Sequence, residues 1–450
     1  MRGEMDTTTS RMALRAGRWT AGLSRRLGRG EGAIIGGRVT LALDPSALRR
    51  LAHRRRVVLV SGTNGKTTTS HLLATLLRTS GSVAHNATGA NMSDGAVAAL
   101  TAAPDAELAV LEVDELHVAA VAEAVDPAVV VLLNLSRDQL DRGNEVRMVA
   151  AAISQALRRH PDTCVVANAD DPMVVWATGA AARVVWVAAG ANWTGDTAGC
   201  PACGEALQVA DSGSWSCTCG LARPATRWRL HPADDTVLRE TAHLDGRTES
   251  IRVSLRLPGA FNLGNAALAL AAAAELGIDV VAAAGALSSI RHVGGRYRTA
   301  VHGPHRLRLL LAKNPAGWAE TLPLLEPDAA RLLVVNARAA DGRDTSWLWD
   351  VPFEQLAQHD NIDRGPGLVA VAGEKAHDLG LRLSYANIAH ITLADPLIAL
   401  TALPPGKVDV IANYTAFRSL ASRLATTDHD PGGALDLERE LQVITGPGLM

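Results

Sequence analysis

The sequence predicts an α/β protein in which a large nucleotide-binding domain precedes a smaller second α/β domain. A glycine-rich loop directly follows a short apolar run at 57–60. Apolar runs then alternate with helical stretches over most of the chain. Such alternation is typical of a parallel sheet covered by helices. At 450 residues the chain can hold two or three domains with large cores.

Changes in composition indicate the domain boundaries. Residues 1–55 are expected to form a basic N-terminal helix and lead-in segment, 56–300 the central domain and 301–450 the C-terminal domain. An insertion at about 191–224 interrupts the central domain, because its composition turns to Gly, Ser, Trp and Cys. Glycines at 294 and 295 indicate a hinge before the last domain.

The N-terminal segment is rich in arginine but lacks the uninterrupted apolar core of a signal peptide. It predicts a peripheral helix that can lie on an anionic surface. No stretch of about 20 apolar residues is free of charge, so we expect no membrane span. We expect a cytoplasmic protein, peripheral to the inner face of the membrane. A net charge of −2 gives no sign of nucleic-acid binding.

The pattern of apolar residues predicts the main elements in order. Strands of the central domain are expected at 57–60, 108–113, 129–133, 164–167 and 183–188, with sheet-like alternation again at 249–257. Helices are expected at 68–79, at 145–159 and in the alanine-rich run that begins with Asn262 to Asn265. The last domain is expected to hold strands at 307–312, 331–335, 368–372 and 408–411.

The glycine-rich loop predicts a site for a nucleoside triphosphate and consists of Gly62, Thr63, Asn64, Gly65, Lys66, Thr67 and Thr68. Its glycines let the backbone approach phosphate oxygens, and its N–H groups face the anion at a helix start. Lys66 adds positive charge, and Thr67 can ligate magnesium. Only four of the 44 basic residues are lysines, so a lysine here indicates that its compact ammonium is needed. Val60 departs from the strict Walker pattern, and a glycine turn without nucleotide is the alternative.

Acidic residues follow the predicted strand at 108–113. Ligands of open α/β sheets bind at the carboxyl edge, and magnesium on a nucleotide takes one or two carboxylates. Glu112 is therefore the preferred metal ligand, with a solvated loop acid as its alternative. Asp114 and Glu115 are interpreted as solvated loop acids. The strand at 129–133 also ends in polar residues, which could equally be an ordinary capped helix start.

Four cysteines form two knuckle-like pairs in the insertion, Cys200 with Cys203 and Cys217 with Cys219. Four soft ligands in two turns can close a tetrahedral zinc site, and a short insertion with little apolar content would gain its fold from the metal. The second pair is C-x-C, whereas zinc ribbons ordinarily use a longer spacing, so unligated thiols are the alternative. The fifth cysteine, Cys164, is expected to be a buried small hydrophobe.

These motifs together resemble the Mur ligase superfamily and, within it, the MurT family. The resemblance covers nearly the whole chain and rests on the segments 62–68, 89–92, 111–115, 134–142, 168–172 and 258–266. It implies that ATP and magnesium bind at Lys66 and Thr67, that Glu112 holds the metal and that Asn265 contacts adenine. It places Asn91 in a loop near the γ-phosphate.

Two departures separate the chain from Mur ligases that add an amino acid. Those enzymes usually have a histidine where this chain has Gln139, and they usually carry a lysine in the central domain. No lysine occurs here between 66 and 313. A site tuned for an incoming amino acid is therefore not expected.

The C-terminal part resembles the MurT-specific domain through the segments 312–318, 341–354 and 413–416. MurT proteins work with GatD, a class I glutaminase. The resemblance implies that Asp350 completes the partner's Cys-His pair, because a carboxylate orients an imidazole and stabilises its charged form. A helix cap is the alternative for Asp350. Asp341 and Asp344 are interpreted as turn residues.

The resemblance implies the synthetase subunit of an enzyme that amidates D-glutamate in lipid II at the membrane surface. ATP would activate the α-carboxylate as an acyl phosphate, which ammonia attacks to give D-isoglutamine. No cysteine stands in a sharp glycine-flanked elbow, so, if ammonia is consumed, we expect another polypeptide to release it. The alternatives are a Mur-like amino-acid ligase of muramyl-peptide or folylpolyglutamate type and a nucleotide-gated scaffold for a glutaminase.

Overall fold

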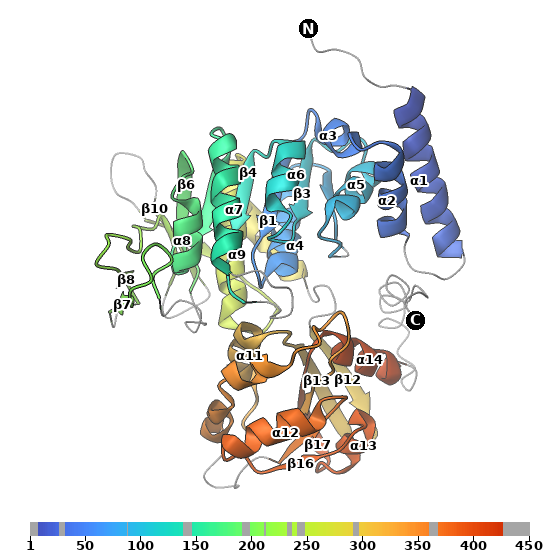
Figure 1. Cartoon of the computed structure of the whole chain (residues 1–450), viewed down its shortest axis with the longest axis vertical. Coiled ribbons are helices and arrows are strands. Elements are labelled where there is room, and N and C mark those ends of the chain that lie inside the picture. Colours follow the sequence, from blue (N-terminus) through green and yellow to red (C-terminus); the bar gives the residue numbers. More distant parts are fainter. Residues whose placement is uncertain are drawn as a thin grey trace. The chain divides into compact units, whose positions relative to one another are not determined.

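The computed structural model describes residues 8–26, 32–87, 89–137, 146–190, 199–210, 213–231, 236–240, 248–290, 297–359 and 368–425. They divide into two compact units (Figure 1). Of the described residues, those between 8 and 136 and between 146 and 290 form the first unit. Arg137 and the residues between 297 and 425 form the second. The predicted glycine hinge lies outside the described residues, and the boundaries at 55 and 300 stay predictions.

The first unit is built on a nine-stranded sheet in the order β11-β10-β9-β6-β5-β4-β1-β3-β2. Its strands are β1 Arg56–Ser61, β2 Val83–His85, β3 Leu108–Glu112, β4 Val129–Leu132, β5 Cys164–Asn168, β6 Arg183–Ala188, β9 Trp228–Leu230, β10 Thr236–Glu240 and β11 Thr248–Arg252. Neighbours from β2 to β9 run parallel, whereas β10 pairs antiparallel with β9 and β11. A small hairpin of β7 (Gln208–Val209) and β8 (Trp215–Ser216) lies in the insertion.

Helices cover both faces of this sheet (Figure 1). The helices of the first unit are α1 Thr8–Arg26, α2 Ala33–Leu43, α3 Ala47–Ala52, α4 Lys66–Leu77, α5 Ser93–Ala102, α6 Val118–Val125, α7 Val146–Arg159, α8 Pro172–Thr178, α9 Ala260–Glu275 and α10 Val280–Ala283, of which α1 packs against α2. A 3₁₀ turn, η3 Ala284–Ser289, follows α10. The five predicted parallel strands are all present, because each is an apolar run: β1, β3, β4 and β5 are buried on both faces, and β6 buries Val185 and Val187. The fold class is confirmed.

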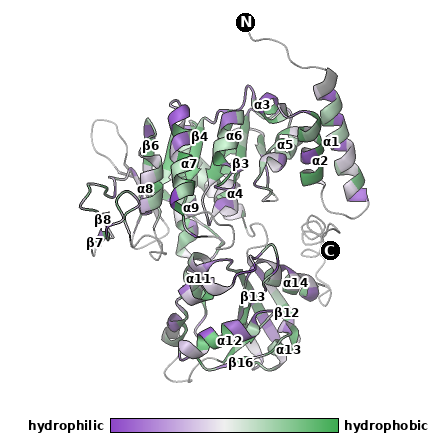
Figure 2. Ribbon diagram, in the orientation of Figure 1, coloured by the Kyte–Doolittle hydropathy of each residue, from purple (hydrophilic) through white to green (hydrophobic). Residues whose placement is uncertain are grey.

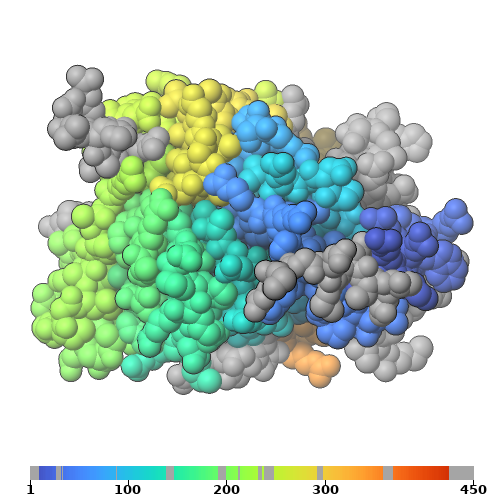
Figure 3. Space-filling model, turned by 90° about the horizontal axis from the view of Figure 1, so that it is seen from above, coloured from blue at the N-terminus to red at the C-terminus, as the bar shows by residue number. Residues whose placement is uncertain are grey.

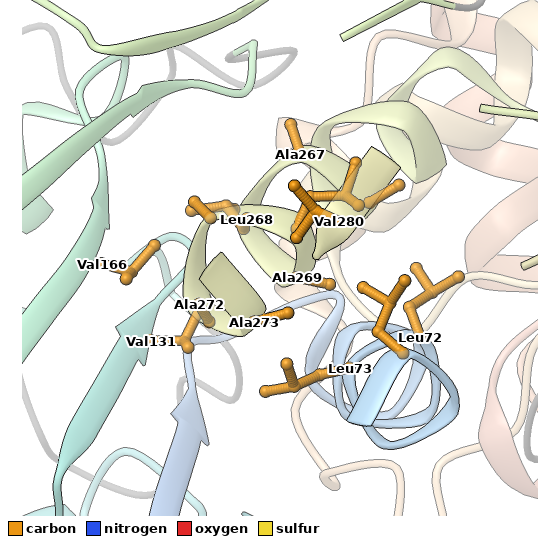
Figure 4. Packing of buried hydrophobic residues seen from close by; sticks show 14 of the residues in the cluster. Leu72, Leu73, Val131, Val166, Ala267, Leu268, Ala269, Ala272, Ala273 and Val280 are labelled. Atoms are coloured by element: carbon orange, nitrogen blue, oxygen red, sulfur yellow. The ribbon is translucent and has the colours of Figure 1, made fainter. Parts of the chain in front are cut away.

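One core cluster packs the alanine-rich helix α9 beside α4 on the same face of the sheet (Figure 4). Leu72 and Leu73 of α4 are fully buried there, each worth about 1.5–3 kcal/mol of burial free energy. Small side chains let α9 approach closely, and a Cβ on Gly264 would lie 2.1 Å from the carbonyl oxygen of Ala189. Figure 3 shows the yellow segment that includes α9 beside the blue segment that includes α4, although they lie far apart in the sequence. The packing brings the start of α9 to the glycine-rich loop.

The second unit holds a six-stranded sheet in the order β12-β13-β17-β14-β15-β16. Its strands are β12 Tyr297–His302, β13 His305–Leu311, β14 Ala330–Val334, β15 Val369–Ala372, β16 His390–Thr392 and β17 Gly406–Ala412. Its helices are α11 Pro315–Thr321, α12 Ala376–Tyr385, α13 Pro396–Thr401 and α14 Tyr414–Ala425, with 3₁₀ turns η4 Leu322–Leu324, η5 Ser346–Asp350 and η6 Phe353–His359. Among the described strands of this sheet, only β12 pairs antiparallel, with β13. The four strands predicted here are all present.

Hydrophobic residues concentrate in the strands and on the inner helix faces of both units (Figure 2). Three helices begin with an aspartate or asparagine followed by proline, namely α8 at Asp171, α11 at Asn314 and α13 at Asp395. Each side chain accepts a backbone N–H of the first turn, and proline suits the first helical position because its missing N–H would have no partner there. Among the described helices, none is long and apolar enough to cross a bilayer.

Candidate active site

The glycine-rich loop connects the buried strand β1 to the start of α4. Gly62 and Gly65 have positive φ angles of 143° and 84°, a conformation that favours glycine. A Cβ at Gly65 would lie 2.7 Å from Oδ1 of Asn265, so the loop leaves no room for a side chain there. Thr68, on the first turn of α4, is buried. The positive φ angles and the close contact with Asn265 explain why the loop has glycine at these positions.

Residues after β4 hold the loop in place. The backbone N–H of Asn64 donates to Oδ1 of Asn134 at 2.8 Å, and Asn134 returns a bond from Nδ2 to the Asn64 carbonyl at 3.1 Å. The N–H of Thr63 donates to the Asn134 carbonyl at 3.0 Å. The hydroxyl of Thr63 bonds to the backbone of Ser136. The sequence predicted polar residues at this strand end but did not predict these hydrogen bonds to the glycine-rich loop.

Lys66 is almost completely buried and pairs with an acid that was predicted to be solvated. Its Nζ lies 2.8 Å from Oε2 of Glu115, whose side chain is only 11% exposed. The ammonium also donates to the carbonyls of Gly62 and Thr63. The prediction for Glu115 is therefore wrong. Glu115 stands three residues after Glu112 at the same strand end, and this position could have indicated that it belongs to the site.

Glu112 ends β3 beside the first turn of α4. The hydroxyl of Thr67 donates to Oε1 of Glu112 at 3.1 Å. Among the described residues, the other carboxylate oxygen, Oε2, is buried and has no hydrogen-bond partner. A Cβ at Gly89 would lie 3.9 Å from both Oε2 and the Thr67 hydroxyl. A buried carboxylate oxygen beside a hydroxyl suits a hard divalent cation with oxygen ligands.

The two remaining predicted nucleotide residues lie near this loop or its acids. Asn265, on α9, is buried against Gly65, and its Nδ2 lies 3.3 Å from Oδ1 of Asn262. The carbonyl of Asn91 accepts the backbone N–H of Asp114 at 2.9 Å, which links the Asn91 loop to the end of β3. The contacts of Asn265 with adenine and of Asn91 with phosphate stay predictions.

The four cysteines of the insertion converge. Their sulfur atoms all lie within 4.8 Å of one another, with Cys200 and Cys219 at 3.6 Å and Cys203 and Cys217 at 3.4 Å. The backbone N–H of Cys219 lowers the pKa of the Cys217 thiol to about 7, whereas hydrogen bonds to Cys217 raise the pKa values of Cys203 and Cys219. The short C-x-C spacing does not keep Cys219 out of the cluster. A compact group of four thiols fits a tetrahedral soft metal ion.

Two contacts attach this cluster to the sheet. The indole N–H of Trp215 donates to the carbonyl of Ala169 at 3.2 Å, and Nε of Arg223 lies 2.7 Å from Asp170. Ala169 and Asp170 directly follow β5. The cysteine cluster is therefore anchored at the carboxyl edge of the sheet, the same edge that carries the glycine-rich loop. Residues 191–198 and 211–212 lie outside the described part.

In the second unit, Asp350 ends η5 and is about one-third exposed. Nη1 of Arg137 lies 3.3 Å from Oδ2 of Asp350. Asp350 is not the residue before a described helix, so its position does not suit an N-terminal cap. The motif that continues from Arg137 to Arg142, including Gln139, lies outside the described residues.

Asp341 is more than the predicted turn residue. It is buried, and its carboxylate accepts the backbone N–H of Thr415 at 2.8 Å and the Thr415 hydroxyl. Burial raises the pKa of Asp341 above its ordinary value. This carboxylate joins the loop after β14 to the start of α14. Asp344 does act as a turn residue, because it accepts the N–H of Ser346 at 2.8 Å.

Comparison with known protein families gives two matches. Residues 60–198 match the Mur ligase middle domain, and residues 311–417 match the MurT ligase C-terminal domain. A relative from Staphylococcus aureus (strain N315), lipid II isoglutaminyl synthase (glutamine-hydrolyzing) subunit MurT, is 30% identical over 89% of this chain and 94% of its own length. The protein of the same name from Streptococcus pneumoniae (strain ATCC BAA-255 / R6) is 32% identical over 78% of this chain and 82% of its own length.

Solved structures show the same fold at low sequence identity. A pseudomurein peptide ligase type C from Methanothermus fervidus has a TM-score of 0.65 and 20% identity, with 83% of this chain and 79% of that chain covered. MurF from Acinetobacter baumannii has a TM-score of 0.61 and 16% identity, with 86% and 80% covered.

Proposed function

The chain belongs to the MurT family of the Mur ligase superfamily, and from this premise we propose that it is the synthetase subunit of a lipid II isoglutaminyl synthase. The main support for this function is that one chain contains matches to both a Mur ligase middle domain and a MurT C-terminal domain. The reaction would convert the D-glutamate residue of the lipid-linked stem peptide into D-isoglutamine. It consumes ATP and ammonia and releases ADP and phosphate.

The glycine-rich loop and its neighbours supply the groups for the ATP step. The loop N–H groups and Lys66 would bind the phosphates, and Thr67 and Glu112 would hold magnesium through their oxygen atoms. A bound magnesium ion would neutralise charge on the transferred phosphoryl group. Lys66 now faces Glu115, so a bound triphosphate would compete with that carboxylate for the ammonium. The orphaned Oε2 of Glu112 supports its assignment as the metal ligand.

The chemistry proceeds in two balanced steps. A carboxylate oxygen of the acceptor attacks the γ-phosphorus, the bond to the ADP oxygen breaks, and an acyl phosphate forms. The ammonia nitrogen then attacks the acyl carbon, phosphate leaves, and the nitrogen loses a proton to give the amide. Activation is needed because phosphate is a far better leaving group than the oxygen of a free carboxylate. Electrostatic stabilisation by Lys66 would act on the charge that accumulates during the first step.

A partner subunit would supply the ammonia. Cys164 is buried, and burial together with the neighbouring Glu275 raises the pKa of its thiol to about 11, which makes it a poor nucleophile. The other four cysteines converge on one another. We therefore assign glutamine hydrolysis to a GatD-like class I glutaminase that forms a heterodimer with this chain. Asp350 would orient the imidazole of the partner's catalytic pair.

The cysteine cluster would hold a structural zinc ion. Its four thiols provide a closed ligand set, which suits a structural rather than a catalytic site. Zinc would stabilise the short strands β7 and β8, which have little core of their own. The lipid-linked acceptor further suggests that the protein acts in the cytoplasm at the inner face of the membrane.

Turnover with two nitrogen donors tests this function. The chain is purified with a small glutaminase and given lipid II, ATP and either glutamine or ammonia. Lys66→Ala should abolish amidation with both donors, whereas Lys407→Ala, which changes an exposed lysine, should not. Asp350→Asn should impair glutamine-driven turnover far more than ammonia-driven turnover. Equal losses with both donors would contradict the role of Asp350, and transfer of an amino acid instead of ammonia would contradict the function.

A further inference from the structure

Helix α1 packs against α2 through glycines. A Cβ at Gly17 would lie 2.6 Å from the carbonyl oxygen of Gly36, and a Cβ at Gly36 would lie 2.7 Å from that of Gly17. Ala13, one turn before Gly17, is also buried. Helix α2 in turn contacts α5, and Arg38 pairs with Asp94 at 2.9 Å. The first unit therefore holds one face of α1 in place and determines which face turns outward.

The outward face carries three large apolar side chains, Met12, Trp19 and Leu23, which we call the apolar stripe. Their exposed fractions are 64%, 70% and 41%. Spacings of seven and four residues place all three within about 40° around the helix. A tryptophan is rarely left this exposed in a folded protein. Figure 1 shows α1 as the outermost helix at this end of the unit, beyond α2.

Positive charge lies along one side of the apolar stripe. Helix α1 contains no acidic residue and five arginines, Arg11, Arg15, Arg18, Arg25 and Arg26, and all five are exposed. At helical spacing, Arg15 and Arg26 lie about 40–60° from Met12 on the same side of the stripe, and the other three arginines lie farther round on that side. Two copies of α1 placed stripe to stripe would bring ten like charges together, which disfavours a second copy as the occupant. The charge instead complements an anionic surface.

This combination matches the chemistry of a lipid bilayer surface. A basic helix with one apolar face lies in the plane of the interface, buries that face at the boundary of headgroups and acyl chains, and gains attraction from anionic lipids. Tryptophan prefers this boundary because its ring is apolar and its N–H is polar. The 19 residues of α1 extend about 28 Å, and the helix does not qualify as a membrane span.

We propose that α1 is a membrane-binding helix that inserts Met12, Trp19 and Leu23 into an anionic leaflet. Membrane binding by α1 extends the proposed function, since a lipid-linked acceptor lies in a bilayer. The evidence for membrane binding comes from the helix alone. Tethering would raise the effective concentration of such an acceptor near the ATP site. It would also orient the first unit, because the glycine contact fixes α1 against α2.

Vesicle flotation with the full chain tests the membrane contact. Vesicles contain phosphatidylcholine alone or with about 30% phosphatidylglycerol, in about 0.1 M salt. The stripe variant combines Met12→Ser, Trp19→Ser and Leu23→Ser. A matched control makes the same number of apolar-to-serine changes at exposed positions on other helices, with Met148→Ser, Val281→Ser and Ile398→Ser.

The wild-type chain and the control should float with anionic vesicles and bind uncharged ones more weakly. The stripe variant should lose at least about tenfold in partitioning, because the inserted apolar area is gone. Retained binding by the stripe variant, or no binding by the wild type, would overturn the membrane contact. A wild-type dimer that becomes monomeric in the stripe variant would overturn it too, because a second copy would then cover the stripe.

A turnover measurement separates this inference from the proposed function. Both variants should amidate an acceptor dispersed in detergent at the wild-type rate, since α1 contributes no group to the ATP site. Only the stripe variant should lose turnover when the acceptor is embedded in anionic vesicles. Equal rates of the stripe variant and the control on vesicles would contradict a role for the contact. Absence of turnover in every variant, including the wild type, would instead contradict the proposed function.

Discussion

Replacing Glu112 with glutamine should separate metal binding from folding. Glu112 is 3% exposed, and Oε2 of its carboxylate is buried without a hydrogen-bond partner among the described residues. Leaving such a group unsatisfied costs about 1–3 kcal/mol, and more when it is charged. Glutamine keeps an oxygen for the Thr67 hydroxyl and removes the charge. The backbone bonds of Glu112 to Asn86 do not involve the side chain. The free energy of unfolding without nucleotide should therefore stay unchanged or rise by about 1–3 kcal/mol.

The nucleotide-bound state should respond in the opposite way. At a concentration of 100 times Kd, magnesium and ADP should stabilise the wild-type chain by about 2.7 kcal/mol. For a unit of this size, that stabilisation corresponds to a rise in Tm of roughly 5–10 °C. Glu112→Gln removes the charge that would hold magnesium, so the part of this shift that depends on magnesium should disappear.

Thermal unfolding with ADP, in the presence and absence of magnesium, measures both effects. Magnesium is omitted rather than chelated, because a chelator would also act on the cysteine cluster. Asp114→Asn is the matched control, since it makes the same acid-to-amide change two residues away, where the side chain accepts the N–H of Leu116 at 3.1 Å. The control should keep the magnesium-dependent shift. An unchanged shift in Glu112→Gln, together with a lower stability without nucleotide, would show that Glu112 is structural and would refute the reasoning.

Three further perturbations address the site and its surroundings. Glu115→Gln should tighten ADP binding several-fold in calorimetry, because Lys66 would no longer be shared with a carboxylate; weaker binding would instead assign Glu115 to magnesium. Cys219→Ser should lower the zinc content of the purified chain and its Tm, whereas Cys164→Ser should leave the zinc content unchanged; equal zinc content in both would exclude the cluster. Burial lowers the pKa of His85 to about 3, so the folded state binds fewer protons than the unfolded state below about pH 6.5. The free energy of unfolding, measured by urea titration, should keep its full value above about pH 6.5 and fall toward pH 3 by up to about 1.4 kcal/mol per pH unit. The same dependence on pH in His85→Gln would exclude this histidine as the cause.

Continuous apolar runs made the central strands predictable, because β1, β3, β4 and β5 are buried on both faces. Two shorter strands escaped prediction, because β2 has only three residues and β10 has no long apolar run. The edge strand β11 overlaps the sheet-like alternation predicted at 249–257, but only over the first residues of that range. An edge strand pairs on one side only, so its sequence carries a weaker signal than that of a central strand.

The parts of the candidate site that lie next to one another in the sequence were predictable, because the phosphate loop has a local backbone requirement. The partners from other elements were not. Glu115 reaches Lys66, and Asn134 braces Asn64, only because loops from neighbouring strands converge at one edge of the sheet. The hydrogen bond from the Thr415 N–H to Asp341 joins the loop after β14 to the start of α14 in the same way. These pairs depend on side-chain directions that periodicity does not specify.

The contact between Asn265 and Gly65 has a consequence for how the protein matures during synthesis. Asn265 stands 200 positions after Gly65 in the sequence, so the ribosome releases the glycine-rich loop long before α9. A nascent chain that stops short of α9 has the loop but not the helix against which it rests. Closing such a long-range contact comes late, because the intervening chain must first be ordered. Competence to bind nucleotide should therefore arise only once the whole first unit has been translated.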